Sequence, residues 1–406
     1  MTPSAQSIAA AAVSPAPKPS VRTVEAVRRP FCGMIDAVLV DEPVPHAFAG
    51  SVVREGAMAA WTWVMRDLCP DLLSAQAIAN GTLRPADIEP AMPEILVRAK
   101  RAQDQLDIDN EAMRRFRAQF GRDNARDELS VVMAALRARS LLGKAQGFGK
   151  AVNSIGEDGA LGVALQSMPL GDPQMAALMF HAAVGQVANP TRLITAVIKL
   201  SGNAKEASIA RNGFSPLVDA CLAHAQNQLH NLQLSGPFAD IDLVCRSLDR
   251  FHRLVRALTG YVEFERGSRT TQVLSTVTRM VSDRVEPRLK EVVTDLNQAM
   301  RRPREGADRI DNDRMLAAMN GVYLLSAVRD CRDSLALNAV FDQAWSQTGQ
   351  ALELHIQRNL DLLRQMPGDA MTGLRLDAAI KMAEVRFNPE YAETLKRARI
   401  AAERRS

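Results

Sequence analysis

The chain has 406 residues, of which 47% are hydrophobic, 24% charged and 4% aromatic, and its formal net charge is +4. This composition is typical of a globular protein, and it excludes a wholly disordered chain, a collagen-like repeat and a small disulfide scaffold. Residues 1–30 carry four basic side chains and one acidic one, residues 391–406 carry five and two, and the rest is close to neutral. A basic surface over the body of the protein, which nucleic-acid binding requires, is therefore not expected.

The first 30 residues are rich in alanine, proline and serine, and no acidic residue precedes Glu25. Such a segment buries too little apolar surface to offset the entropy lost on ordering, so we predict a disordered leader at 1–30. It does not resemble a secretory signal peptide, because its apolar run Ile8–Val13 is short and lacks a preceding basic residue. Its composition suits a linker, or alternatively a leader for export by a contact-dependent bacterial secretion system. Abundant arginine and alanine favour a bacterial source.

The least charged region is 159–198, where only Asp172 and Arg192 are charged. Within it, residues 173–191 form an uncharged stretch of 19 residues, nearly long enough to span a bilayer. Four strongly polar side chains interrupt this stretch, and a proline closes it. The sequence therefore predicts a buried central helix here and no transmembrane segment.

Apolar residues recur at spacings of three and four over 241–262, 268–302 and 341–363, which is the pattern of long packed helices. Pro287 is expected to kink or interrupt the second of these helices. Strand signals are nearly missing, and the one short apolar run, Ala37–Val40, has no evident partner. We predict an all-α, multi-helix protein with long antiparallel helical bundles in its C-terminal half. A glycine-containing seam at 202–213 divides it into helical domains 31–211 and 212–406.

The segment Gly143–Lys150 resembles a phosphate-binding loop. The required first glycine falls at Lys144, however, and the required serine or threonine falls at Ala151. We therefore interpret the segment as a flexible connection between two helices, with Gly143 ending the first.

Two groups of carboxylates resemble cation sites. Asp107–Glu111 begins like a calcium loop, but alanine stands where the loop needs its glycine and its glutamate. Asp308, Asp311 and Asp313 resemble a magnesium-binding helix, yet arginines surround them, so a charge-mixed helix start is expected.

One predicted helix carries Asp219, Cys221, His224 and His230. Cys221 and His224 share a face, whereas His230 is turned away, and two ligands do not make a metal site. We interpret the group as a satisfied helix surface, and we expect no metal and no cofactor. The remaining histidines are single and are expected to be structural, namely His46, His181, His252 and His355.

The five cysteines are Cys32, Cys69, Cys221, Cys245 and Cys331. Their wide spacing gives no CxxC pair, which indicates thiols in a reducing compartment. The sequence leaves open whether Cys69 or Cys331 acts as a nucleophile together with a distant histidine.

Near the end of the chain, Asn388–Tyr391 spells an Asn-Pro-x-Tyr sequence. We expect Asn388 to cap the last helix and Pro389 to begin it. This terminal helix, 389–405, carries five basic residues and is expected to be solvated.

No intact catalytic pattern occurs in this helical chain. The sequence therefore favours a non-enzymatic adaptor or scaffold that acts through protein–protein contacts in the cytoplasm, with a protein as its partner. Two alternatives remain: an exported bacterial protein, and a small-molecule enzyme whose site is assembled from distant residues. The sequence identifies no catalytic residue and does not determine the oligomeric state.

Overall fold

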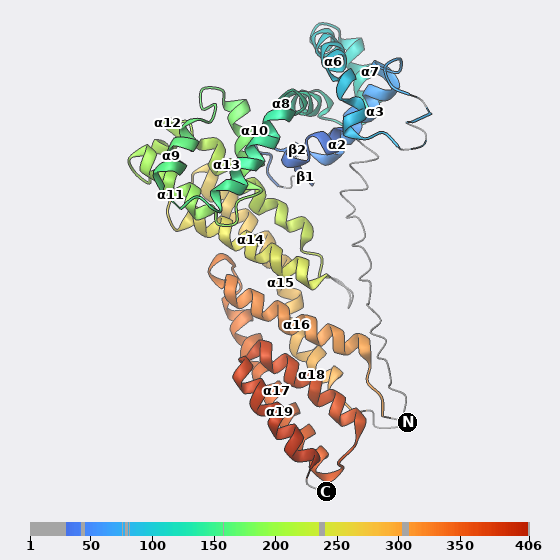
Figure 1. Ribbon diagram of the computed structural model, residues 1–406, viewed down its shortest axis with the longest axis vertical. Coiled ribbons are helices and arrows are strands. Elements are labelled where there is room, and N and C mark those ends of the chain that lie inside the picture. Colours follow the sequence, from blue (N-terminus) through green and yellow to red (C-terminus); the bar gives the residue numbers. More distant parts are fainter. Residues whose placement is uncertain are drawn as a thin grey trace, which may run out of the picture. The chain divides into compact units, whose positions relative to one another are not determined.

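A computed structural model describes residues 30–404, except for 42–44, 75, 78–79, 81, 157, 235–239 and 303–307. The predicted leader 1–30 lies outside the described residues apart from Pro30. Helices make up almost all of the regular structure, which confirms the predicted all-α class (Figure 1).

The longer helices are α2 (Pro30–Met34), α3 (Arg54–Trp63), α5 (Pro85–Ile88), α6 (Met92–Leu106), α7 (Asn110–Phe120), α8 (Ala125–Val152), α9 (Asp158–Gln166), α10 (Pro173–Val184), α11 (Pro190–Ser201), α12 (Glu206–Arg211), α13 (Ser215–Asn227), α14 (Ile241–Thr259), α15 (Arg269–Ala299), α16 (Asn312–Cys331), α17 (Asn338–Gln365), α18 (Ala370–Arg386) and α19 (Pro389–Glu403). Short helical turns connect some of them: η1 (Asp36–Val38), η2 (Val64–Leu68), η3 (Glu89–Ala91), η4 (Gln228–Asn231) and η5 (Arg332–Ser334). The two strands are β1 (Leu39–Val40) and β2 (Val52–Val53).

The chain forms two compact units. Unit 1 contains residues 30–36 and Glu55–Arg137, and unit 2 contains Ala37–Arg54 and residues 138–404. The division falls inside α8, whereas the glycine-containing segment 202–213 lies within unit 2. Compactness alone does not establish which segments fold independently. The domain boundary between 211 and 212 therefore stays a prediction.

Unit 1 is built around aromatic side chains. Phe31 of α2 packs edge-on against Trp61 of α3, with ring centroids 5.1 Å apart. Trp63 makes the same kind of contact with Phe116 of α7, at 5.2 Å. Helix α7 then ends at Gly121, whose φ of 74° is the left-handed conformation that glycine adopts without strain. These contacts bury one face of each helix in the small core of this unit.

In unit 2, the run Ala37–Val40 has a partner that the sequence did not reveal. Strand β1 pairs in parallel with β2, with Leu39 opposite Val52. The chain between the strands is tied to the end of α13, because the Gln226 amide accepts from His46 N at 3.1 Å and donates to His46 O at 2.8 Å. This segment therefore packs against residues far away in the sequence.

The predicted connection at Gly143–Lys150 is wrong, because α8 runs unbroken through it to Val152. Gly143 and Gly147 are exposed and have no neighbours where a side chain would stand. At Gly149, a Cβ atom would lie 2.2 Å from the carbonyl oxygen of Ala183 in α10. A close approach of two helices thus requires this glycine, and packing offsets the cost of about 1 kcal/mol that glycine brings to a helix interior.

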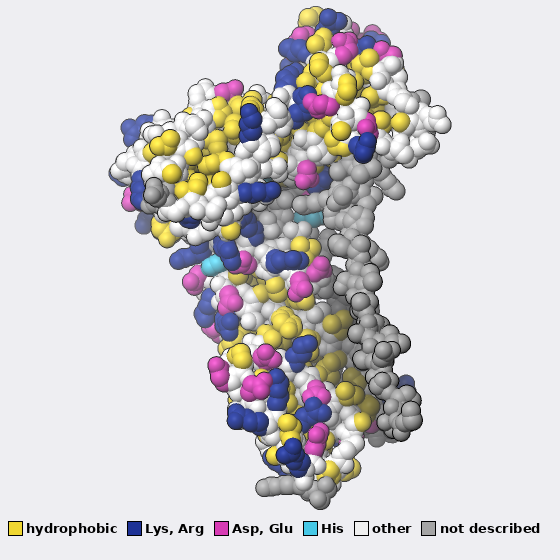
Figure 2. Space-filling model, in the orientation of Figure 1, with side chains coloured by type: hydrophobic (Ala, Val, Ile, Leu, Met, Phe, Trp, Pro, Cys, Tyr) yellow, Lys and Arg dark blue, Asp and Glu magenta, His cyan; other side chains and the backbone are white. Residues whose placement is uncertain are grey.

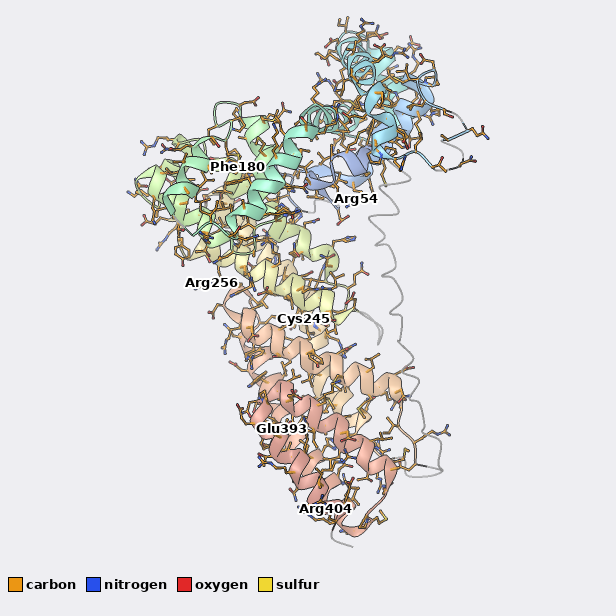
Figure 3. All side chains as sticks on the ribbon, viewed as in Figure 1. Arg54, Phe180, Cys245, Arg256, Glu393 and Arg404 are labelled. Atoms are coloured by element: carbon orange, nitrogen blue, oxygen red, sulfur yellow. The ribbon has the colours of Figure 1, made fainter. Side chains whose placement is uncertain are left out.

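The larger core of unit 2 joins α10, α11, α13, α14, α15 and the N-terminal part of α17. Phe180 of α10, labelled in Figure 3, contacts Phe214 at 6.2 Å between ring centroids. Helix α15 continues through Pro287 without interruption. The periodic apolar positions predicted for α14 and α15 are buried in this core or the one beside it: Val244, Leu248, Phe251, Val255, Leu258, Leu274, Val277, Val281, Val285, Leu289, Val292 and Leu296.

A second core of unit 2 lies among the ends of α15 and α16 and helices α17, α18 and α19. Short turns join α17 to α18 and α18 to α19, so successive helices run antiparallel (Figure 1). The first of these turns contains Gly368 at φ 90°. The predicted helical bundle in the C-terminal half is thereby confirmed.

The uncharged stretch 173–191 forms the whole of α10 and the beginning of α11. Eight of the twelve residues of α10 are buried, as expected for a central helix. Within the residues that the structure describes, no helix combines the length and the apolar character needed to cross a membrane.

Candidate functional site

The predicted group on α13 is more deeply buried than the sequence indicated. Asp219 is at the surface, where Arg269 donates to it at 2.8 Å. Cys221 is fully buried in the core, which corrects the prediction of a satisfied helix surface. His230 lies apart in η4. Among the described residues, no group of three or more His, Cys, Asp or Glu side chains could hold a metal ion.

His181, predicted to be single, forms a pair with His224 that joins α10 to α13. Their ring centroids are 4.2 Å apart. The Nε2 of His224 lies 2.8 Å from the carbonyl oxygen of His181, to which its N–H donates. Both ring nitrogens of His181 are buried, and neither has a hydrogen-bond partner among the residues that the structure describes. Burial lowers the pKa of both rings, to about 4 for His224, so the pair is neutral at pH 7.

An arginine of α14 completes this buried cluster. The guanidinium of Arg250 donates to the carbonyl oxygen of Val184 at 2.6 Å and also to that of Val187, at the end of α10. The carbonyl of Val184 also accepts from the backbone N–H of Val187 at 3.2 Å, so the arginine adds a charged donor to the turn that ends α10. Burial raises the pKa of the neighbouring Cys221 thiol to about 12. The thiol is therefore protonated and a weak nucleophile at pH 7, and the cluster packs α10 against α13 and α14.

The histidine pair predicts an acid-sensitive fold. Unfolded histidine has a pKa near 6.5, while both folded rings titrate below that value, so the unfolded chain binds more protons as the pH falls. The free energy of unfolding of unit 2 should therefore decrease between pH 7.5 and 5.5, by up to about 1.4 kcal/mol per pH unit for each histidine below pH 6.5. Urea unfolding at these pH values measures the effect.

In this test, His181→Leu should reduce the slope of the unfolding free energy against pH, because it removes one of the two histidines that take up a proton on unfolding. Its stability at pH 7.5 should not fall, because the buried ring nitrogens of His181 have no hydrogen-bond partner among the described residues. His230→Gln, at an exposed position, is the control and should leave the slope unchanged. An unchanged slope in His181→Leu would contradict the assignment.

The remaining candidate nucleophiles are buried as well. Burial raises the pKa of Cys69, and that of Cys331 to about 12. The thiol of Cys245, labelled in Figure 3 on α14, has its pKa raised to about 11 for the same reason. His252 bonds to Ser334 at 2.9 Å and His355 to Asn297 at 2.8 Å, as structural histidines do. All five cysteines lie in the described part of the chain and are thiols.

The three aspartates around α16 have separate structural roles. Asp311 caps the helix by accepting from the backbone N–H of Arg314 at 3.1 Å. Asp313 lies in the first turn, where the helix dipole favours a negative charge. Asp308 instead binds Arg375 of α18 at 2.9 and 2.5 Å, and Arg302 at 3.0 Å. The predicted charge-mixed helix start thus describes Asp311 and Asp313, whereas Asp308 lies before the helix and pairs with a buried arginine.

A buried arginine organises this region. Arg375 is fully buried, and its donation to Asp308 is the main reason that the pKa of this carboxyl is lowered. Arg302 also donates to Asp369, and to the hydroxyl of Thr372 at 2.9 Å. The network thus holds the end of α15 against the start of α18. Arg375 and Asp369 could not be predicted from the sequence, because nothing in the local pattern marks a buried arginine or its partners.

Beside this network, a cavity of about 670 Å³ opens between the end of α15 and the start of α16. Four arginines and one aspartate supply its charge. The residues that line it are Gln298, Ala299, Arg301, Arg302, Arg309, Ile310, Asp311 and Arg314. Such a volume is in the range of small-molecule sites.

A second candidate is the surface of α9 and the loop after it, residues 159–171, which we call the α9 segment. It contains no charged residue. Leu161 and Leu165 are buried beneath it, while Val163 is 69% exposed. Figure 2 shows hydrophobic and uncharged side chains gathered where Figure 1 labels α9, α10 and α12, whereas charges of both signs cover the visible face of the C-terminal bundle.

The Asn-Pro-x-Tyr sequence is part of a helix start, as predicted. The side chain of Asn388 accepts from the backbone N–H of Tyr391 at 2.7 Å, and Pro389 is the first residue of α19. Tyr391 is half-buried and packs edge-on against Phe387 at 5.2 Å. The capping role accounts for the asparagine and the proline, and packing accounts for the tyrosine.

In comparisons with known proteins, no family model, no curated protein and no solved structure matches the chain. The class that the structure defines is therefore an all-α, multi-helix protein. Its two candidate sites are the α9 segment and the arginine-lined cavity.

Proposed function

We propose that this protein is a non-enzymatic helical adaptor that binds a protein partner through the α9 segment. The observation that supports the proposal most directly is the exposure of Val163 in the middle of 13 residues without a charge. At the usual charged fraction of about one quarter, a segment of this length would carry about three charged side chains. Charged residues are depleted in the cores of protein interfaces, and exposed apolar patches mark such surfaces.

The packing of α9 supports the same proposal. Because Leu161 and Leu165 anchor the helix in the core of unit 2, the exposure of Val163 is a property of the folded state. Gly162 faces the end of α11, where a Cβ atom would lie 3.7 Å from Leu200. From Gly159 on, the helix therefore offers a firm surface without charged side chains, which suits an apolar surface of another protein better than a charged peptide or a nucleic acid.

Val163→Glu should reduce partner binding by at least about tenfold, since it places a charge in the interface core without touching the fold. The partner is first identified by placing a photo-crosslinking amino acid at position 163 in cells of the source organism. Affinity is then measured with the purified partner by calorimetry. The melting temperature should stay unchanged, because the side chain is exposed.

Ile108 provides the matched control, because it is 87% exposed and belongs to unit 1. A crosslinker at 108 should not capture the partner, and Ile108→Glu should bind the partner with the affinity of the unmodified protein. Identical adducts at 163 and 108 would contradict the proposal. If the crosslinker at 163 captures only a second copy of this chain, the α9 segment mediates self-assembly and the adaptor proposal is wrong.

A further inference from the structure

We propose that the cavity between α15 and α16 binds a phosphate monoester of a polyol or sugar, independently of the α9 segment. The charges around the cavity are unequally engaged. Arg302 is bound by Asp308 and Asp369, and Arg314 pairs with Asp311 at 3.2 Å. Arg301 and Arg309 form no ion pair with any residue that the structure describes. Within the described part of the chain, two guanidiniums are therefore left without an acidic partner.

Two available arginines match a dianion on a single group. A phosphate monoester carries a charge of about −1.5 to −2 at pH 7 and three strong acceptor oxygens. Guanidinium binds such oxygens in a bidentate manner, whereas a single carboxylate needs only one arginine.

The engaged arginine gives the cavity a fixed wall. The guanidinium of Arg302 donates hydrogen bonds to Asp308, to Asp369 and to the hydroxyl of Thr372. Asp308 is in turn held by the buried Arg375. Because these bonds form within the protein, Arg302 keeps its place when a ligand enters, which reduces the entropy lost on binding.

The rest of the lining indicates what the phosphate is attached to. A volume of about 670 Å³ is much larger than a phosphate group, so there is room for an organic body. The amide of Gln298 suits a hydroxyl group, and Ile310 and Ala299 provide apolar contact. None of the described lining residues is aromatic, so they offer a nucleobase no ring to stack on. A hydroxylated, non-aromatic body fits best.

Isothermal titration calorimetry on the full chain tests the proposal with five probes. They are fructose 6-phosphate, fructose, inorganic phosphate, AMP and a glycine peptide with a central phosphoserine. Fructose 6-phosphate should bind saturably and more tightly than the other four. The double variant Arg301→Gln/Arg309→Gln should weaken it by at least about tenfold, because it removes two charge-assisted contacts. Arg301→Lys/Arg309→Lys should lie in between, because it keeps the charge and loses the bidentate geometry.

Arg279→Gln is the matched control, because Arg279 is an exposed arginine of the same helix, α15, outside the cavity. It should leave binding unchanged, and all variants should keep the melting temperature, since Arg301 and Arg309 are exposed. Equal binding by the double glutamine variant, or no binding of fructose 6-phosphate, would overturn the proposal. Tighter binding of AMP or of the phosphopeptide would overturn the inference that the phosphate is attached to a polyol or sugar. If inorganic phosphate binds as tightly as fructose 6-phosphate, the cavity recognises the anion alone.

Discussion

Replacement of Phe251 by aspartate is expected to unfold the larger core of unit 2. Phe251 is completely buried in α14, in the middle of the apolar face that the sequence predicts. Loss of a buried phenyl ring alone costs about 3–5 kcal/mol, and the carboxylate adds the cost of a buried charge without a partner. The total is comparable to the entire stability of a typical domain, about 5–15 kcal/mol. Circular dichroism melting curves should show the native transition of this unit lost or shifted far down.

Glu263→Ala is the control for this variant. The Glu263 side chain is exposed, and its backbone bonds to Glu206 and Ala204 persist in the alanine variant. Its melting temperature should therefore stay near that of the unmodified protein. Phe251→Leu, which keeps much of the volume, should be intermediate. Similar melting temperatures for Phe251→Asp and Glu263→Ala would show that the apolar face of α14 has been assigned in the wrong register.

The long helices of unit 2 could be predicted because their signal is local. In α14, α15 and α17 the apolar residues recur at the period of the helix itself, so the buried face and the approximate ends follow from the sequence. The helix end predicted at Gly143 is wrong, because a helix continues through a glycine where packing on either side holds it together. Gly149, six residues later, is needed for the close contact with α10. That requirement belongs to the tertiary structure.

The candidate site was less accessible to sequence reasoning, because its partners are distant. Asp308 and Arg375 are 67 residues apart, and His181 and His224 are 43 apart. Nothing in one sequence relates the members of either pair. The arginines at 301–314 are evident in the sequence. Which of them form ion pairs depends on the start of α18, where Asp369 is the N-cap and Thr372 lies in the first turn. The pairing of β1 with β2 could not be predicted because each strand has only two residues, too few for a periodic signal.

Asp308→Ala is expected to destabilise the C-terminal bundle more than Arg375→Met does. Without Asp308, the buried guanidinium of Arg375 keeps only its bond to the carbonyl oxygen of Arg309 at 3.2 Å. Removing one partner from a buried ion pair costs about 3–5 kcal/mol, because the other charge is left without compensation. Methionine at 375 removes that charge and fills similar space. Asp308 then still pairs with Arg302, and 28% of its side chain is exposed to solvent.

Urea unfolding of the two single variants and of the double variant measures this difference. Asp308→Ala/Arg375→Met should be more stable than Asp308→Ala alone, because the second change removes the unpaired charge that the first creates. Asp361→Ala, which breaks an exposed pair with Arg364 on α17, is the control and should cost less than about 1 kcal/mol. Equal losses for the two single variants, with additive loss in the double, would mean that shape rather than charge holds Arg375 in the bundle.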